Sequence, residues 1–265
     1  MITGKVYLVG AGPGDPELLT LKAARLLRTA DAVLHDELVT PAILHLANPA
    51  AQIHNVGKRR TSKKITQDEI NFLLVGLASG GLQVVRLKGG DPSIFGRAGE
   101  EIEALRRAGI PYEVVPGVTA ALGAAAGAGI PLTHRRGPAA VVFVTGHRAA
   151  NNEEADWRTF VRGGATLVVY MPGRNLGEIA RRLRNAGLAG ETLCAVVSRA
   201  STADQQLHVT TVDELPALPA LAAPALLIVG EVVGLAAAQG ERFMTPAMEQ
   251  VLLQATNRNY GEITP

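Results

Sequence analysis

Short apolar runs alternate with amphipathic stretches along the first 115 residues of the chain. The apolar runs are rich in β-branched and aliphatic side chains, which is typical of buried strands. In the stretches between them, apolar residues recur three and four positions apart, as on the buried face of a helix. The pattern predicts strands at residues 5–9, 31–35, 52–56, 82–88 and 112–115, and helices at 16–30, 67–77 and 97–108.

The alternation continues after Pro116-Gly117, which we interpret as a domain junction. A helix rich in alanine and glycine follows, and the remaining strands are predicted at residues 140–144, 166–170, 193–197, 208–211 and 225–229. Strands that alternate with helices are typical of α/β proteins. The expected fold class is α/β, with mostly parallel or mixed sheets. Two α/β domains are expected, at 1–115 and 116–239, with a tail at 240–265.

The run 114–133 carries no charge and approaches the length of a membrane-spanning helix. It is rich in Ala, Gly and Pro rather than in Leu and Ile, so we interpret it as a tightly packed interior helix. The first residues lead directly into a predicted strand, and we expect no signal peptide. These features together predict a cytoplasmic protein with no membrane partner.

Three glycines alternate in GAGPG at 10–14, directly after the first predicted strand. This is the edge of the sheet where α/β proteins bind ligands. A dinucleotide fingerprint requires a further glycine where this chain has Asp15, and Pro13 lacks an N–H group for a phosphate. We expect Asp15 to be a helix N-cap, with Pro16 in the first helical position. The turn therefore suits a neutral or cationic ligand better than a phosphate.

A second glycine turn, Gly89-Gly90-Asp91, follows the strand predicted at 82–88. Two such turns in one sheet favour a single binding crevice more strongly than either turn alone. Asp36 follows the strand predicted at 31–35 and has three open interpretations. It is a ribose ligand, a general base or a solvated loop carboxylate, and its position alone does not decide among them.

The chain carries 26 basic and 24 acidic residues, a balance that does not by itself indicate a nucleic-acid partner. Many cations nevertheless lie in loops, where guanidinium groups match a small molecule with several carboxylates. A flexible solvated loop is the alternative for the basic run at 58–64. Aromatic residues make up only 4% of the chain, which argues against stacking with RNA bases. The loop cations are Lys58, Arg59, Arg60, Arg97, His134, Arg135, Arg136 and Arg148.

Several common catalytic motifs are absent from the sequence. No His, Asp and Glu cluster has metal-ligand spacing, so no metal is expected, and neither a nucleophile elbow nor a Walker motif occurs. Cys194 is the only cysteine, which excludes an internal disulfide. Because it lies in an apolar run, we expect a buried and inert thiol.

Seven motifs along the chain resemble those of the tetrapyrrole methylase family. They are GAGPGD (10–15), VGKR (56–59), VRLKGGDP (85–92), FGR (95–97), PGVTA (116–120), GIPLTHR (129–135) and YM (170–171). The long runs are specific to the family, whereas the first turn alone is not. The resemblance implies two α/β domains with an active-site cleft between them, and usually a homodimer.

The resemblance also implies an activity. Members of the family use S-adenosyl-methionine to methylate C2 and C7 of uroporphyrinogen III, which gives precorrin-2 for sirohaem, cobalamin or haem d1. The cationic sulfonium suits a glycine turn without a phosphate site, and the eight carboxylates of the substrate suit basic loops. Carried over by position, the cofactor would contact Pro13, Gly89, Gly90, Asp91, Ile94, Thr119, Ala120, Met171 and Ala200.

The acid/base residues of the family fall on Asp36 and Lys58. Asp36 would accept the proton that the methylated ring loses, and Glu100 is a reserve base. Arg97 and Arg135 are the expected contacts for acetate or propionate groups of the substrate. The family often has Tyr-Asp-Arg where this chain has His-Asp-Glu at 35–37, so the carboxylate is kept and its neighbours differ.

Three other functions fit parts of the sequence. One is an RNA-directed methylase of the same fold, and another is a protein that binds a tetrapyrrole or S-adenosyl-methionine without turnover. Retention of Asp36 and Lys58 argues against the binding protein. The third is a dinucleotide oxidoreductase, against which Pro13 and Asp15 argue.

Overall fold

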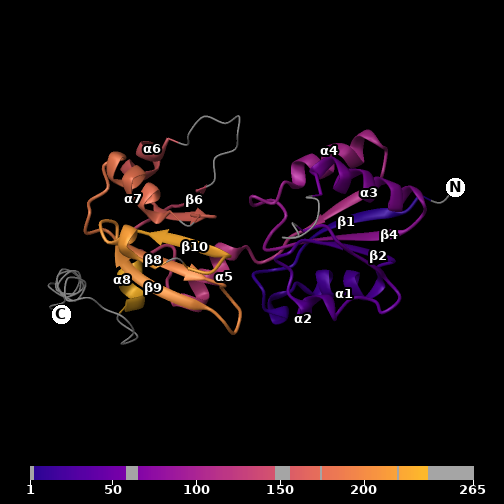
Figure 1. The fold of residues 1–265 in the computed structure, drawn as a ribbon, viewed down its shortest axis with the longest axis horizontal. Coiled ribbons are helices and arrows are strands. Elements are labelled where there is room, and N and C mark those ends of the chain that lie inside the picture. Colours follow the sequence, from indigo (N-terminus) through magenta and orange to yellow (C-terminus); the bar gives the residue numbers. More distant parts are fainter. Residues whose placement is uncertain (1–2, 58–64, 147–155, 174, 220, 238–265) are drawn as a thin grey trace. The chain divides into compact units, whose positions relative to one another are not determined.

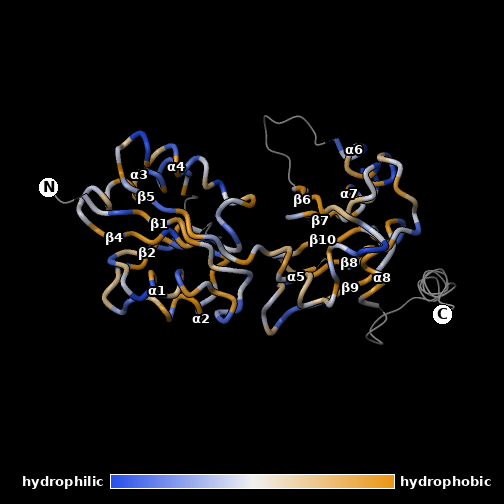
Figure 2. The backbone as a smooth tube through the Cα atoms, turned by 180° about the vertical axis from the view of Figure 1, so that it is seen from behind, coloured by the Kyte–Doolittle hydropathy of each residue, from blue (hydrophilic) through white to orange (hydrophobic). Residues whose placement is uncertain are grey.

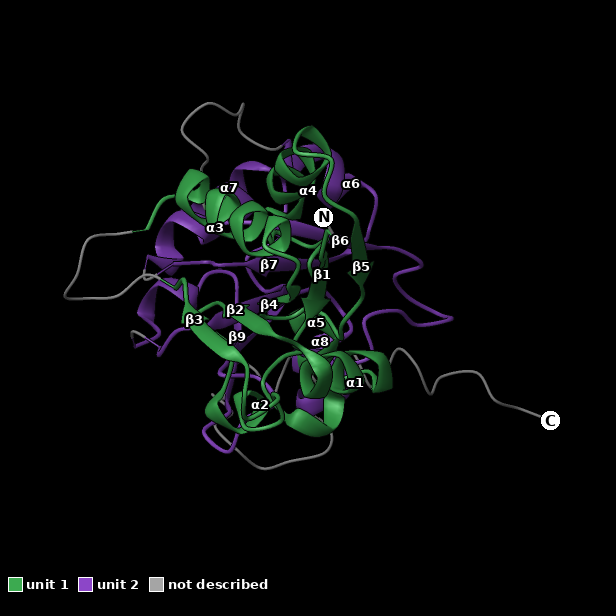
Figure 3. Ribbon diagram, turned by 90° about the vertical axis from the view of Figure 1, so that its right-hand side faces the viewer, with its two compact units in different colours: residues 1–123 green, residues 124–265 purple. Residues whose placement is uncertain are grey.

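The computed structural model describes residues 3–57, 65–146, 156–173, 175–219 and 221–237. The chain divides into two compact units, unit 1 (Met1–Gly123) and unit 2 (Ala124–Pro265), which Figure 3 shows in different colours. The sequence pattern places the domain junction at 115/116, whereas this division falls inside helix α5 (Ala120–Ala128). The tail predicted at 240–265 lies outside the described residues.

Unit 1 is built around a five-stranded sheet in which every pair of neighbours is parallel. The strands are β1 (Lys5–Gly10), β2 (Ala32–His35), β3 (Gln52–Asn55), β4 (Gln83–Lys88) and β5 (Tyr112–Val115). Their order across the sheet is β3-β2-β4-β1-β5. Each strand agrees with its predicted range to within one residue at either end, because buried parallel strands give strong apolar runs.

Helices cover both faces of this sheet (Figure 1). They are α1 (Leu21–Thr29), α2 (Pro41–Leu44), α3 (Gln67–Ser79) and α4 (Ala98–Arg107). Successive side chains of a strand point to opposite faces, so each strand contributes to two cores. On one face, Leu74 of α3 and Leu105 of α4 pack with Leu8 of β1. On the other face, Leu27 of α1 packs with Val9 of β1.

The strand order reverses between β1 and β4. From β1 the chain crosses β4 to reach β2, whereas from β4 it crosses β1 to reach β5. The loops that follow β1 and β4 therefore leave the sheet from neighbouring carboxyl ends and diverge. This is the place where open α/β sheets bind ligands, and the two glycine turns occupy it.

The first long helix begins later than predicted. Asp15 does cap a turn, since its Oδ1 accepts a hydrogen bond from Glu17 N at 2.8 Å, but Pro16–Leu18 form a single 3-10 turn. α1 then begins at Leu21, where the Thr20 side chain accepts a hydrogen bond from Ala23 N. Asp15 and Thr20 are thus both N-caps, and the spacing of apolar residues does not indicate which of them begins the long helix.

Unit 2 contains a mixed five-stranded sheet in the order β6-β7-β10-β8-β9. Its strands are β6 (Val141–Thr145), β7 (Thr166–Tyr170), β8 (Leu193–Ser198), β9 (Gln206–Thr211) and β10 (Ala225–Val229). β6 and β7 are parallel, while β10 is antiparallel to both β7 and β8, and β8 is antiparallel to β9. The predicted fold class, α/β with parallel or mixed sheets, is confirmed.

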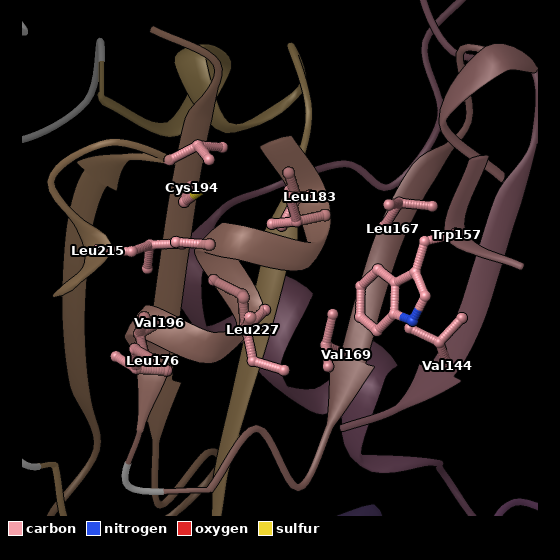
Figure 4. Close-up of a cluster of buried hydrophobic side chains, with 14 of the residues drawn as sticks. Val144, Trp157, Leu167, Val169, Leu176, Leu183, Cys194, Val196, Leu215 and Leu227 are labelled. Carbon is pink, nitrogen blue, oxygen red and sulfur yellow. The ribbon is translucent and has the colours of Figure 1, made fainter. Parts of the chain in front are cut away.

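Helices α6 (Trp157–Arg162) and α7 (Leu176–Asn185) pack on one face of the second sheet. Figure 4 shows Trp157, from α6, and Leu183, from α7, in a cluster with Val169 and Leu227 of the strands. Cys194 is part of the same cluster, and burial raises the pKa of its thiol above the ordinary value. The prediction of a buried thiol is confirmed.

The charge-free run 114–133 contains helix α5, which is nine residues long. Ala121 and Ala124 are buried, but Leu122 is 52% exposed, so the helix packs on one side only and the prediction of a tightly packed interior helix is wrong for its other side. Alanine and glycine have little apolar surface to bury, and a run of them therefore does not require burial on every side. Within the described residues, no helix is both long and apolar enough to cross a membrane.

Three short helices of the structure are not predicted by the apolar spacing. They are α2, α6 and α8 (Val233–Ala237). Helices of four to six residues are too short for a helical repeat to be recognised. Figure 2 shows the contrast, because hydrophobic colours follow β10, whose five residues are all apolar, whereas hydrophilic colours recur along α3 and α4.

Two leucines of α1 test the core assignment. Leu27 is 0% exposed and Leu21 is 92% exposed, on the same helix. We expect Leu27→Ala to lower the free energy of unfolding by about 2–5 kcal/mol. Leu21→Ala should change it by less than about 0.5 kcal/mol. Urea unfolding followed by far-UV circular dichroism measures both, and equal losses would contradict the assignment.

Candidate functional site

The two glycine turns meet at the carboxyl ends of β1 and β4. Gly12 N donates a hydrogen bond to Gly90 O at 3.1 Å, and Gly90 N donates one to Gly12 O at 2.7 Å. Gly12 and Gly90 have φ angles of 72° and 67°, in the left-handed region that favours glycine. The two turns therefore lie together, while the single binding crevice stays a prediction.

A third backbone segment, the loop after β5, approaches the same point. A Cβ atom on Gly117 would lie 2.5 Å from Gly90 O and 2.8 Å from Gly10 Cα. Asp91 ties these segments together, since its Oδ2 accepts a hydrogen bond from Gly117 N at 3.0 Å and its Oδ1 accepts one from Ser93 N at 2.8 Å. The Asp91 side chain thus has a structural role, whereas its contact with a cofactor stays a prediction.

Helix α5 begins beside the second glycine turn. A Cβ atom on Gly90 would lie 3.4 Å from Ala120 N. Thr119 is buried, and its carbonyl oxygen accepts hydrogen bonds from the first turn of the helix. The predicted cofactor residues Pro13, Gly89, Gly90, Asp91, Ile94, Thr119 and Ala120 all lie in the three segments that meet here. The result is a close packing of three backbone segments with few side chains between them.

The other two predicted cofactor residues, Met171 and Ala200, belong to unit 2. Met171 directly follows β7, is 49% exposed and has a φ angle of 49°. Ala200 lies between Arg199 and Ser201, whose φ angles are 48° and 59°. Positive φ angles are uncommon outside glycine, and such strain concentrates at functional sites. The cofactor roles of both residues stay predictions.

Asp36 follows β2 and is anchored to the neighbouring strand β4. Arg86 Nη2 donates a hydrogen bond to Asp36 Oδ1. The Asp36 side chain is 30% exposed, whereas that of Arg86 is 3% exposed. Asp36 is therefore not a freely solvated loop carboxylate. Its loop also runs beside the second glycine turn, because a Cβ atom on Gly89 would lie 3.0 Å from Leu38 Cβ.

A buried ion network extends from Arg86 into unit 1. Arg86 Nε donates a hydrogen bond to Glu101 Oε1 at 2.9 Å. Lys88 Nζ donates to both carboxylate oxygens of Glu101, at 2.9 and 3.0 Å. Gln67 Nε2 also lies 3.3 Å from Glu101 Oε1 as a donor. Glu101 is 0% exposed, and Arg86 and Lys88 are each 2% exposed, so their charges depend on one another for stabilisation.

Burial affects the two cations of the network differently. Burial alone would lower the pKa of Arg86, but the charges of Asp36 and Glu101 outweigh it and raise that pKa. Burial, together with the charge of Arg86, lowers the pKa of Lys88. Arg86 is thus firmly cationic, while the surroundings of Lys88 oppose its charge.

This network is not among the predicted site features, although the sequence contains a signal for it. Arg86 and Lys88 lie on the same face of the strand as the buried Val84, because side chains alternate along β4. Glu101 lies four residues before Leu105, on the buried side of α4. Charged residues at positions that a pattern marks as buried indicate a paired set of charges.

Lys58, the predicted partner of Asp36, lies outside the described residues, as do Arg59 and Arg60. Gly57, the residue before Lys58, is described and shows where the loop begins. A Cβ atom on Gly57 would lie 2.5 Å from Glu37 N, so the chain at Gly57 touches the residue that follows Asp36.

Arg97 and Glu100 form a two-pronged ion pair at the start of α4. Arg97 Nε and Nη2 donate to Glu100 Oε1 and Oε2 at 2.7 and 2.6 Å. The hydrogen bond to Glu100 raises the pKa of Arg97, and the same bond lowers the pKa of Glu100. A carboxylate held in this way is a weaker base, which argues against Glu100 as the reserve base. Arg97 has a φ angle of 57° and is half exposed.

The remaining predicted cations belong to unit 2. His134, Arg135 and Arg136 are exposed in the loop before β6, and Arg136 N donates a hydrogen bond to His134 Nδ1 at 3.2 Å. Arg148 lies outside the described residues. Among the residues that the structure describes, no group of three His, Cys, Asp or Glu side chains is placed to hold a metal ion.

Comparison with protein families matches residues 5–216 to the Tetrapyrrole (Corrin/Porphyrin) Methylases. The siroheme synthase of Pseudomonas paraeruginosa is 52% identical over 238 residues, which cover 89% of this chain and 51% of that protein. The siroheme synthase of Azotobacter vinelandii is 53% identical over 235 residues, with 88% and 51% covered. The chain thus spans about half the length of the curated relatives it matches.

Comparison with solved structures agrees. The uroporphyrin-III C-methyltransferase of Thermus thermophilus, complexed with S-adenyl homocysteine, is 44% identical and has a TM-score of 0.77. The match covers 88% of this chain and all of the other chain. This likeness supports the observed α/β fold over nearly the whole chain.

The contact between the glycine segments predicts a strong effect of one methyl group. We expect Gly117→Ala to lower the free energy of unfolding by about 1–3 kcal/mol, because its Cβ meets backbone atoms that cannot rotate away. Gly99→Ala, on α4 with nothing within 4 Å of the new Cβ, is the matched control. It should leave stability unchanged or raise it by less than about 1 kcal/mol. Urea unfolding measures both, and a harmless Gly117→Ala would contradict the close contact.

Proposed function

The chain belongs to the tetrapyrrole methylase family, and on that premise we propose that it is an S-adenosyl-methionine-dependent uroporphyrinogen-III C-methyltransferase. It would methylate C2 and C7 of uroporphyrinogen III and release precorrin-2, for sirohaem, cobalamin or haem d1. The observation that carries the proposal is the meeting of two glycine turns at the strand-order reversal, beside an anchored carboxylate.

The glycine segments of unit 1 fit S-adenosyl-methionine. Gly12 and Gly90 use φ angles that favour glycine and are buried against each other, while the adjacent Pro13 and Gly89 are partly exposed. Pro13 lacks an N–H group, and Asp15 is engaged in capping, so the turn is poorly suited to a phosphate. Neither feature opposes a cationic sulfonium. Met171 and Ala200 of unit 2 complete the proposed set of cofactor contacts.

When bound, S-adenosyl-methionine would supply an electrophilic methyl group, whose carbon an electron-rich pyrrole carbon would attack in line with the C–S bond. The C–S bond would break as the C–C bond forms, S-adenosyl-homocysteine would leave, and the cationic macrocycle would then lose a proton. We assign the acceptance of that proton to Asp36. Its Oδ1 is bound to Arg86, so Oδ2 is the atom assigned to take the proton. Lys58 is proposed to return protons elsewhere on the macrocycle.

The substrate carries eight carboxylates, and we propose that arginines bind them. Arg135 is exposed in a basic loop and is a candidate for a two-pronged contact. Arg97 is already paired with Glu100, so a substrate carboxylate would have to share or displace that partner. A homodimer is part of the same proposal.

The RNA-directed methylase and the binding protein without turnover are the alternatives, and one assay separates them. The chain is incubated without oxygen with uroporphyrinogen III and S-adenosyl-methionine, and the products are examined by mass spectrometry and absorbance. The proposal requires two added methyl groups per macrocycle. Methylation of ribosomal RNA fragments only would favour the first alternative, and ligand binding without turnover would favour the second.

Asp36→Asn tests the proton acceptor. We expect kcat to fall about 100-fold or more, because the amide cannot take the ring proton, while the Kd for S-adenosyl-methionine stays the same. Asp68→Asn, an exposed aspartate at the start of α3, is the matched control and should turn over normally. Oxygen-free kinetics and calorimetry measure the two quantities. Wild-type kcat in Asp36→Asn would remove Asp36 from the mechanism.

Arg135→Ala tests substrate binding. Loss of one charge-assisted hydrogen-bonding group should raise KM for uroporphyrinogen III by about tenfold and leave the Kd for S-adenosyl-methionine unchanged. Arg107→Ala, an exposed arginine at the end of α4, serves as the control. A parallel loss of affinity for both ligands in Arg135→Ala would point to a structural role instead.

A further inference from the structure

We infer that Arg86 and Glu101 are positioning residues, which hold Asp36 in the orientation that proton transfer requires. The inference rests on the proposed function, because it assumes that Asp36 accepts a proton during turnover. It extends that function to two residues in the interior of unit 1. Arg86 lies in the run 85–92 but has no role in the sequence-based predictions, and Glu101 lies outside the seven motifs.

The register of the sheet brings these groups together. β2 and β4 are parallel neighbours, with Leu34 opposite Arg86. Asp36 lies two residues after Leu34 and so continues the same face of the sheet, which is the face that α3 and α4 cover. Glu101 reaches this face from the first turn of α4. Asp36 after β2 and Glu101 of α4, which are 50 and 15 residues from Arg86, thus converge on its guanidinium.

The Arg86 guanidinium has little freedom to move. Nε is bound to Glu101 at 2.9 Å, Nη2 to Asp36, and Nη1 lies 3.3 Å from the carbonyl oxygen of Leu87 as a donor. A planar group held through all three nitrogens fixes the direction of each N–H bond. The orientation of Asp36 follows from the anchoring of Arg86, rather than from packing around Asp36 itself.

Glu101 is in turn held by Lys88 and Arg86, so the network contains two cations and two carboxylates. Within it, Asp36 is the member with a substantially exposed side chain, at 30% against 3% or less for the others. Among the described residues, Arg86 is the one that donates a side-chain hydrogen bond to Asp36, and it uses Oδ1. The buried members therefore present one carboxylate oxygen at the surface in a fixed place.

Stability alone is a weak explanation for such a network. Removing buried charges from water is costly, and well-packed apolar side chains of similar volume often give equal or greater stability. The apolar side chains of Val84 and Leu105 surround the same face and show that such packing is available there. The arrangement is explained if the buried charges orient Asp36, the carboxylate of the network that reaches the surface.

A double-mutant cycle tests the inference. Arg86→Lys keeps the charge but lacks the fork that reaches two carboxylates, so we expect kcat with uroporphyrinogen III to fall about tenfold or more. KM and the Kd for S-adenosyl-methionine should stay within about twofold. In an Asp36→Asn background, the same substitution should change kcat by less than about twofold, because the group that it positions is already disabled.

The control and the alternative variant come from the same region. Arg106→Lys alters an exposed arginine of α4 that donates a hydrogen bond to Tyr112, and it should leave kcat unchanged. Glu101→Gln keeps the shape of the side chain and removes the charge that anchors Arg86. It should show the same non-additivity with Asp36→Asn, and it replaces Arg86→Lys if thermal unfolding shows that the latter does not fold.

Each outcome decides the inference. An equal fall in kcat in both backgrounds would mean that Arg86 acts independently of Asp36 and would overturn it. If the wild-type chain has no turnover, the proposed function fails, and crystal structures of the wild type and Arg86→Lys decide the positioning role. Displacement of the Asp36 carboxylate in the variant would support that role, and an unchanged carboxylate would refute it.

Discussion

Backbone contact at the ends of β1 and β4 is the constraint on which the rest of unit 1 depends. Gly12 and Gly90 exchange two hydrogen bonds, and Gly117 approaches so closely that a side chain there would meet backbone atoms. Because the strand order reverses at this point, the loops diverge immediately beyond the contact. The loops thereby meet through their peptide groups. The charged side chains of the buried ion network come from neighbouring elements.

The charges come from the covered face of the same sheet. Arg86 and Lys88 occupy buried positions on the inward side of β4, and Glu101 occupies one on the inward side of α4. Burial makes these charges mutually dependent, so their geometry is more restricted than that of exposed pairs such as Arg97 and Glu100. The meeting of the glycine turns and the anchored carboxylate thus arise from adjacent strands of one parallel sheet.

Much of the fold follows from the sequence because buried strands have strong local patterns. β5 and β7 agree with prediction at both ends, and both glycine turns were located correctly. The start of α1 was predicted wrongly. Both Asp15 and Thr20 cap a helical turn, and only the structure shows that the long helix begins after Thr20. The ion network was not predicted, because Asp36 and Arg86 are 50 residues apart and their pairing depends on the register of two strands.

The start of α4 has one further consequence. Glu100 and Glu101 are consecutive, and side chains of consecutive residues on a helix point about 100° apart. Glu100 therefore joins Arg97 at the surface while Glu101 joins Arg86 in the interior. Adjacent residues of one helix therefore belong to an exposed ion pair and to the buried network, so the placement of α4 sets the geometry of both.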